Sequence, residues 1–321
     1  MTNVQKNIVF SNPPLDKLAQ LVHRPGQTTT LQTSETLVKR AKAKYFTNAY
    51  TKSLASLKSP LQKSYNNTIF GCSNSLVQTE QKITTRYCGN RWCVVCNRIR
   101  TAKMINGYKK QLDELENTYF VTLTIPNVNG DILRSTIKEM TKTFQNILKK
   151  FHHDKVKVVL LRKLECTYNP IRNDFHPHFH LLVSEHSLAK EIVSEWLKRC
   201  KTASIQAQDI RKADKGSSME LFKYFSKIIT DKKIYVNALD TIFQAMRGLR
   251  VYQPVGIKKV SEEIEEVQAQ IYEELERAEK IWTWIEEDWI DVHSGECLTG
   301  YTPDTRIKEL VEKNISTNAE I

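Results

Sequence analysis

Long apolar runs are missing from this sequence. No stretch of about 18 or more apolar residues occurs, which excludes an ordinary transmembrane helix. The opening residues, 1–6, lack the apolar core of a signal peptide. The seven cysteines are an odd number and four of them are clustered, which argues against the disulfide framework of a secreted protein. We therefore expect a cytoplasmic protein with reduced thiols and no membrane partner.

Acidic side chains are scarce in the first 250 residues. That part holds 41 Lys and Arg against 19 Asp and Glu, whereas residues 251–321 hold 7 against 17. The chain has 321 residues, of which 40% are hydrophobic, and this is enough for one large domain or two modest ones. A basic body of this strength favours a nucleic-acid partner over charge that serves only solubility. The acidic end is more typical of a solvated or protein-facing helical region than of a DNA-binding surface.

The first two predicted segments are a basic, polar and loosely packed N-terminal arm at residues 1–66, with a short helix at 34–45, and a Cys-rich segment at 67–110. Within the second segment, the Cys93–Cys96 turn has the spacing that places two thiolates on one metal. Two further cysteines, Cys72 and Cys88, would complete a closed structural zinc site. Reduced core cysteines are the alternative. A thioredoxin-like redox pair is disfavoured, because no βαβ pattern surrounds the turn.

From residue 101 onward the apolar spacing predicts a regular series of elements. In chain order they are a helix at 101–115, a strand at 119–125, a helix at 132–151, strands at 156–168 and 177–183, a helix at 187–200, an edge strand at 203–210 and a helix at 215–229. This order predicts an α+β fold in which a split βαβ antiparallel sheet carries helices on one face. The corresponding catalytic domain would span residues 111–232.

The last predicted segment, residues 233–321, is a helical and acidic C-terminal region. A helix is expected at 233–250 and a long acidic helix at 261–287. Four aromatic residues predict a cluster near the end of the chain: Trp282, Trp284, Trp289 and Tyr301.

The predicted strand at 177–183 continues an alternation that places His176, His178 and His180 on one face. Glu165 lies near the end of the preceding strand, and the turn-like link after it can bring its carboxylate beside His178 and His180. Two imidazoles and a carboxylate with open positions make a catalytic site for Mn²⁺ or Mg²⁺, and also suit Zn²⁺. The alternatives are that the histidines are ordinary surface or core residues whose hydrogen bonds are satisfied, and that Glu165 is a surface carboxylate. His176 is expected to support the site rather than bind the metal.

A third pattern lies on the predicted helix at 215–229. Glu220, Tyr224 and Lys227 stand at i, i+4 and i+7, and so share one face. A phenol is a poor nucleophile at neutral pH because its unperturbed pKa is about 10, but a nearby metal or cation would stabilise its oxyanion as it attacks phosphorus. Glu220 could act as a base and Lys227 could supply charge. An ordinary amphipathic helix with a half-buried tyrosine is the alternative.

Taken together, these motifs resemble the HUH endonuclease superfamily, and most closely the rolling-circle replication initiators of small Gram-positive plasmids. The resemblance covers roughly residues 72–260. The matching motifs are the Cys-rich segment 88–98, a first motif at 120–124, an acidic strand at 164–169, the His-hydrophobe-His metal motif at 176–183, the single-tyrosine motif at 223–227 and a weaker motif at 246–250. Val94-Val95 replaces the usual Cys-Pro run after Cys93, which leaves the predicted ligands untouched.

The resemblance implies a mechanism and partners. Tyr224 would attack one phosphodiester in a single-stranded part of the double-strand origin, and would leave a 5′-phosphotyrosyl link and a free 3′-OH. His178, His180 and Glu165 would hold the Mn²⁺ or Mg²⁺. Plasmid origin DNA, a host helicase and a single-strand-binding protein are the implied partners.

Other functions stay open from the sequence. A transposase or a relaxase would use the same histidine–tyrosine chemistry, but the Cys-rich segment and Glu220 favour the replication initiator. A zinc-dependent hydrolase would use the histidine strand and Glu165 on a water molecule, without Tyr224. A zinc-ribbon DNA-binding regulator would explain the basic charge and the cysteines, but would leave the histidine strand and the tyrosine helix face as coincidences.

Overall fold

The structure is a computed structural model. It describes residues 34–79, 83–115, 117–214, 221–222, 227–230, 232–258 and 278–316. They form two compact units: unit 1 draws on residues 34–103, 232–237 and 278–316, and unit 2 on residues 104–230 and 238–258. Each unit therefore combines pieces of several of the four consecutive segments predicted above. None of the helices in these ranges is long and apolar enough to cross a membrane.

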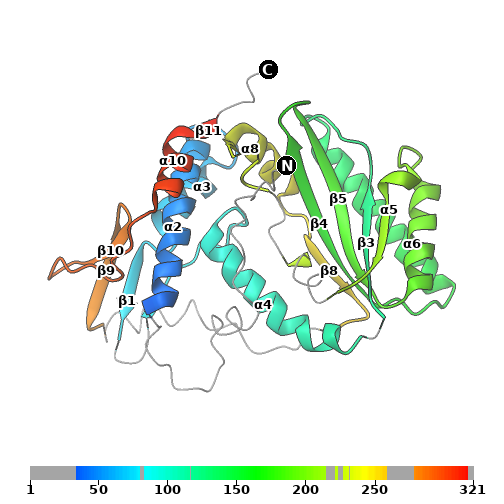
Figure 1. The fold of residues 1–321 in the computed structure, drawn as a ribbon, viewed down its shortest axis with the longest axis horizontal. Coiled ribbons are helices and arrows are strands. Elements are labelled where there is room, and N and C mark those ends of the chain that lie inside the picture. The colour runs from blue at the N-terminus through cyan, green and yellow to red at the C-terminus, as the bar shows by residue number, and fades with distance from the viewer. Residues whose placement is uncertain are drawn as a thin grey trace, which may run out of the picture. The chain divides into compact units, whose positions relative to one another are not determined.

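Unit 2 is organised around a five-stranded antiparallel sheet with the strand order β6-β3-β5-β4-β8 (Figure 1). The strands are β3 (Tyr119–Thr124), β4 (Leu160–Asn169), β5 (Asp174–Val183), β6 (Asp209–Lys212) and β8 (Tyr252–Val255). Strands β3 and β4 are both antiparallel to β5, which lies between them, so they run in the same direction as a split pair. The predicted neighbourhood of the three central strands is thereby confirmed.

Two helices, α5 (Leu133–His153) and α6 (His186–Arg199), pack on one face of this sheet (Figure 1). The buried side chains of α5 recur every three or four residues, which is the spacing of one helix face. The ring of Phe179 on β5 lies 5.7 Å from the ring of Phe144 on α5 and 5.8 Å from that of Trp196 on α6. The odd-numbered side chains of β5 therefore point to the helices.

The remaining predictions for unit 2 need adjustment. The residues expected as a strand at 203–210 form a short 3₁₀ helix (Ile205–Ala207) before β6, because the Ser204 side chain accepts a hydrogen bond from the Gln206 amide and starts a turn. The helix α4 (Val94–Asp113) begins earlier than expected and is divided between the units after Lys103. The expected helix at 215–229 lies largely outside the described residues. Within 233–250 the helix is α8 (Val236–Met246).

Unit 1 contains a second antiparallel sheet, with the order β10-β9-β1-β2, and a short parallel pair, β7 with β11. Its elements are α2 (Ser34–Ala55), α3 (Gln62–Gly71), β1 (Ser75–Gln78), β2 (Ile83–Thr85), the start of α4, β7 (Ile234–Tyr235), β9 (Lys280–Ile285), β10 (Asp288–Asp291), α10 (Thr305–Lys313) and β11 (Ile315–Ser316). Strand β1 pairs directly with β9, so residues about 200 positions apart in the sequence share one sheet.

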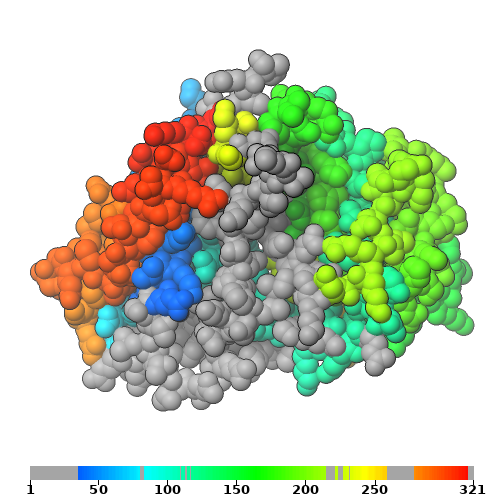
Figure 2. Space-filling view, viewed as in Figure 1, coloured from blue at the N-terminus to red at the C-terminus, as the bar shows by residue number. Residues whose placement is uncertain are grey.

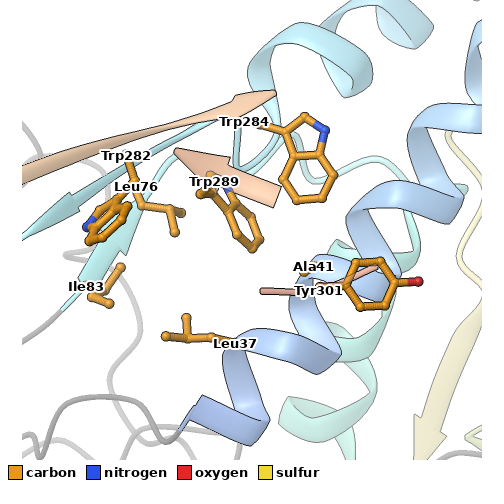
Figure 3. Packing of buried hydrophobic residues seen from close by; sticks show 8 residues of the cluster. All are labelled: Leu37, Ala41, Leu76, Ile83, Trp282, Trp284, Trp289 and Tyr301. Carbon is orange, nitrogen blue, oxygen red and sulfur yellow. The ribbon is translucent and has the colours of Figure 1, made fainter. Parts of the chain in front are cut away.

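The core of unit 1 is rich in tryptophan (Figure 3). Side chains of α2 and of strands β1, β2, β9 and β10 pack together there, and the rings of Trp284 and Trp289 meet edge to face at 4.7 Å. The cluster consists of Leu37, Ala41, Leu76, Ile83, Trp282, Trp284, Trp289 and Tyr301. The predicted aromatic cluster is thus confirmed. Strands β9 and β10 and helix α10 form the orange and red surface of Figure 2.

Two expectations about unit 1 are wrong. Residues 34–66 are not a loose arm, because α2 buries Phe46 and Tyr50, and the Thr47 hydroxyl donates to the Ala43 carbonyl at 2.7 Å. The acidic helix expected at 261–287 does not reach its predicted end, because residues 280–285 form β9. Trp282 and Trp284 alternate there with more exposed neighbours, which is strand periodicity.

Candidate functional site

The first candidate site is the histidine face of β5. Since Phe179 and its odd-numbered neighbours face α5 and α6, strand alternation turns His176, His178 and His180 to the opposite face. Strand β5 is central in the sheet, so both neighbouring strands can add side chains to this face. The register pairs Glu165 on β4 directly with His178. The sequence patterns that predicted this juxtaposition are therefore matched by the strand pairing.

The three predicted ligands converge on one point. Nε2 of His178 lies 3.1 Å from Nε2 of His180, and the latter lies 3.7 Å from Oε2 of Glu165. One ligand atom from each residue lies within 4.8 Å of the other two. Ligand atoms about 2.1 Å from one divalent ion stand about 3.0 to 3.4 Å apart, so these groups fit a single ion with only small adjustment. The mixed nitrogen and oxygen set suits Mn²⁺, Mg²⁺ or Zn²⁺.

Hydrogen bonds on the other side of each ring orient the two imidazoles. Nδ1 of His178 lies 3.0 Å from the His176 carbonyl oxygen, and Nδ1 of His180 lies 3.2 Å from Oγ1 of Thr122. A carbonyl can only accept, so His178 carries its proton on Nδ1 and keeps the Nε2 lone pair free. The side chain of His176 stands apart from this set: it contacts the Thr124 hydroxyl and stacks on the His178 ring at 4.9 Å.

Burial and charge set the protonation of this face. Burial lowers the pKa of His178 and lowers the pKa of His180 to about 4, so both rings are neutral near pH 7. Burial by itself would raise the pKa of Glu165, but the Lys163 ammonium, 2.7 Å from Oε2, and the two histidines hold it below its usual value. Neutral imidazoles and an ionised carboxylate are the forms that bind a cation.

Lys163 was not among the residues predicted from the sequence. Its side chain is fully buried, and the register places it opposite His180 on the same face as Glu165. A lysine is almost never fully buried without a partner, and here the Glu165 carboxylate is that partner. The available signal was the spacing of two residues between Lys163 and Glu165, which puts them on the same face of a strand.

The second candidate site is the group of four cysteines in unit 1. Cys72 follows α3, Cys88 follows β2, and Cys93 and Cys96 lie at the start of α4. The Sγ atom of Cys72 lies 3.5 Å from those of Cys93 and Cys96, and Cys88 Sγ lies 3.6 Å from Cys96 Sγ. Four thiolates about 2.3 Å from one zinc ion stand about 3.8 Å apart, so the group could bind zinc as predicted.

A buried ammonium lies beside the four cysteines. Nζ of Lys44 on α2 donates to the carbonyls of Ile69 and Cys72, at 3.0 and 2.7 Å. Burial lowers the pKa of Lys44 to about 8, although the neighbouring cysteines oppose this shift. Hydrogen bonds from the other thiols lower the pKa of Cys88, whereas burial raises that of Cys93. Lys44 thus places positive charge next to sulfurs that become anionic when they bind a metal.

The third predicted group is only partly described. Glu220 and Tyr224 lie outside the described residues. Lys227 is described and its side chain is exposed, while Leu221 and Phe222 are buried. The placement of the tyrosine beside the histidine face therefore stays a prediction.

Comparison with known proteins gives the chain a family. The model of the Rep_1 family, described as replication protein, matches residues 80–288, which is well over half of the chain. The matched range contains Glu165, His178 and His180, and also three of the four clustered cysteines.

Individual relatives agree with this match. Protein rep of Staphylococcus aureus is 33% identical over 159 residues, which cover 44% of this chain and 69% of the relative. Protein rep of a Bacillus species is 27% identical over 217 residues, covering 56% and 70%, and that of Streptococcus pneumoniae serotype 2 is 27% identical over 201 residues, covering 56% and 62%. No solved structure shows a significant match. From the family match and these identities, the chain belongs to the Rep_1 family of replication proteins.

Proposed function

We propose that this chain initiates rolling-circle replication of a plasmid by binding its origin and nicking one strand. The observation that carries the proposal is the convergence of Glu165, His178 and His180 on one sheet face, in a member of a replication protein family. The basic charge of the first 250 residues supports a DNA partner. A host helicase and a single-strand-binding protein would act on the DNA that the nick opens.

The proposed reaction joins the protein to DNA through Tyr224. The phenol oxygen attacks the scissile phosphorus while the bond from phosphorus to O3′ breaks. The phenol proton passes to a carboxylate, for which Glu220 is the candidate, and the departing oxygen takes up a proton to become a 3′-hydroxyl. A polymerase extends this hydroxyl, and the 5′-phosphate stays on Tyr224. When the round ends, Glu220 activates water or the second attack.

The chain's own residues prepare this chemistry. Glu165, His178 and His180 would hold a divalent ion, which when bound supplies the positive charge that polarises the phosphate. Lys163 fixes the Glu165 carboxylate in its ionised form. Lys227 would add positive charge near the phosphate.

The decisive experiment incubates the protein with supercoiled DNA bearing the cognate origin, with and without Mn²⁺. We expect a nick, a covalent adduct that peptide mass spectrometry places on Tyr224, and no product without the ion. Tyr224→Phe protein should still bind the origin but form no adduct, whereas the control Tyr119→Phe should nick like the unchanged protein. Normal nicking by Tyr224→Phe would show that the nucleophile is another group.

The same assay separates the competing functions. A nick with a free 5′-phosphate and no adduct would indicate a hydrolase that uses a metal-bound water. An adduct whose 3′-hydroxyl does not prime leading-strand synthesis would indicate a transposase or a relaxase.

A further inference from the structure

One face of α3 in unit 1 is fixed to the cysteine group. The ring of Tyr65 on α3 meets that of Trp92 at 4.9 Å. The Thr68 hydroxyl accepts a hydrogen bond from the Trp92 indole at 3.0 Å and lies 3.6 Å from Cys88 Sγ. The Asn90 side chain also donates to the Thr68 hydroxyl and to the Ser64 carbonyl. The cysteine group and the loop that carries Cys88 therefore hold α3 in a defined orientation.

The opposite face of α3 is exposed. Lys63, Asn66, Asn67 and Phe70 stand at i, i+3, i+4 and i+7, and all four side chains are exposed. The Phe70 side chain is 71% exposed, which is a poor position for a large ring unless something covers it. The helix has no acidic residue. An ammonium, two side-chain amides and an apolar ring are the groups with which proteins contact DNA phosphates, adenine edges and thymine methyl groups.

The surroundings of α3 point to a polyanion as the occupant of this face. Residues 34–103, the first part of unit 1, hold 13 Lys and Arg against 2 acidic residues. Lys52 and Lys58 are exposed on either side of the residues that end α2, and the Gln62 side chain ties α3 to this end by donating to the Ala55 carbonyl at 3.1 Å. Exposed cations therefore lie near the N-terminal end of α3, and their positive charge is complementary to the phosphates of duplex DNA rather than to a basic or apolar protein surface.

We infer that α3 enters the major groove of duplex origin DNA and reads its sequence with Asn66 and Asn67. Lys63 contacts the phosphate backbone, and Phe70 makes apolar contact with a base. An α-helix measures about 10 to 12 Å across with its side chains, so it fits into a major groove about 12 Å wide. The inference rests on the proposed function and deepens it: unit 1 recognises the duplex, whereas the histidine face of unit 2 acts on the cleaved strand.

The test measures binding of the full chain to two linear duplexes: the origin of the replicon that encodes the chain, and a shuffled duplex of the same base composition. Asn66→Ala with Asn67→Ala should weaken origin binding at least tenfold while leaving binding to the shuffled duplex unchanged. Lys63→Ala should weaken binding to both duplexes alike. It should also reduce the slope of log affinity against log salt concentration by about one, as expected for the loss of one phosphate contact. Phe70→Ala should lower origin affinity severalfold.

Matched controls lie on α5, where Asn146 and Lys149 are also exposed. Asn146→Ala and Lys149→Ala should bind both duplexes as the unchanged protein does. Retained zinc content and far-ultraviolet circular dichroism of each α3 variant exclude misfolding as the cause of weaker binding.

Nicking of a single-stranded oligonucleotide that carries the cleavage site distinguishes the two proposals. The α3 variants should nick it at the normal rate. If the combined Lys63, Asn66 and Asn67 to Ala variant prefers the origin duplex as strongly as the unchanged protein, α3 is not the reading element, whether or not nicking occurs. If the unchanged protein does not nick at all, the proposed nicking function fails while the duplex-binding result still decides the role of α3.

Discussion

The contact between Lys163 and Glu165 determines much of the chemistry of the histidine face. The ammonium is fully buried and lies 2.7 Å from a carboxylate that also faces His180. A buried ion pair of this kind adds little net stability compared with apolar packing, but it is costly to break. Its role is therefore to fix where the Glu165 carboxylate lies and to keep it charged.

Lys163→Leu should lower the free energy of unfolding of unit 2 by about 2 to 4 kcal/mol, because it leaves the Glu165 charge without its partner in a largely buried place. Adding Glu165→Leu to this variant should recover part of the loss. Urea unfolding of the two single variants and the double variant measures the coupling. Strictly additive losses would show that the pair does not interact.

His180→Ala should weaken Mn²⁺ binding by about 100-fold or more, since it removes one of three converging ligands. His176→Ala should change Mn²⁺ affinity less than about tenfold, because His176 orients His178 through its backbone carbonyl, which the substitution keeps. Isothermal titration calorimetry on protein treated with EDTA makes the comparison. Equal losses in the two variants would place His176 among the ligands.

Much of this face was predictable because it depends on alternation. His178 and His180 share a side of one strand, and a short link returns the chain beside Glu165, so their juxtaposition follows from the spacing. Lys163 was missed because periodicity shows which side a residue takes but not whether the sheet buries it. That depends on what covers the strand.

Among the elements, α3 and the start of α4 depend on the cysteine group for their placement. The unchanged protein should bind about one zinc ion per chain, and Cys93→Ser should lose this zinc. The substitution should also lower the thermal stability of unit 1, because the four sulfurs join three separate segments. Cys297→Ser removes an exposed thiol and should change neither quantity. Chelator-released zinc, measured with a colorimetric indicator, and thermal melts provide the readout. A Cys93→Ser protein that retains its zinc would exclude Cys93 as a ligand.

The hairpin of β9 and β10 stabilises unit 1 mainly through Trp289, which is fully buried and whose indole donates to the Ser73 carbonyl at 2.8 Å. Trp289→Ala should lower the free energy of unfolding by about 3 to 5 kcal/mol. Trp289→Phe should lower it clearly less, because the phenyl ring fills part of the cavity that alanine would leave. Ile285→Ala, on the exposed side of the same hairpin, should change stability by less than about 0.5 kcal/mol. Denaturant unfolding that ranks Ile285→Ala with Trp289→Ala would contradict this packing.

The same hairpin shows why sequence patterns mislead at the level of elements. A run of glutamates from residue 262 onward has helical character, and it extends into a segment that the structure shows as a strand. The tryptophans at 282 and 284 alternate with period two, but pairing with β1 decides the outcome, and the partner strand lies about 200 residues earlier. Local sequence propensity does not show which distant strand will pair with a segment.

At the scale of the whole molecule, unit 1 is assembled from distant parts of the chain. Removal of residues 278–321 takes away β9 and β10 and with them half of the sheet and three of the five tryptophans. The truncated chain should lose the packing of unit 1 but keep that of unit 2, whose described elements all precede residue 259.

Two tryptophans remain after this truncation, and they report on different units. Trp92 is buried beside the cysteine group in unit 1, and Trp196 is buried under the sheet of unit 2. In truncated chains that keep one of them, with the other replaced by Phe, Trp92 should emit like an exposed indole and Trp196 like a buried one. Blue-shifted emission from Trp92 would show that unit 1 holds together without its hairpin.

Synthesis of the chain from its N-terminus imposes an order on these two units. All strands of the unit 2 sheet have been made once residue 255 is added, so that sheet can form while translation continues. Strand β1 is made early but must wait with an unpaired edge until β9, which ends at Ile285, has left the ribosome. A chain released early by a premature stop before β9 therefore carries the histidine face of unit 2 but an incomplete sheet in unit 1. In such a chain β1 keeps its unpaired edge, because β9 is never made.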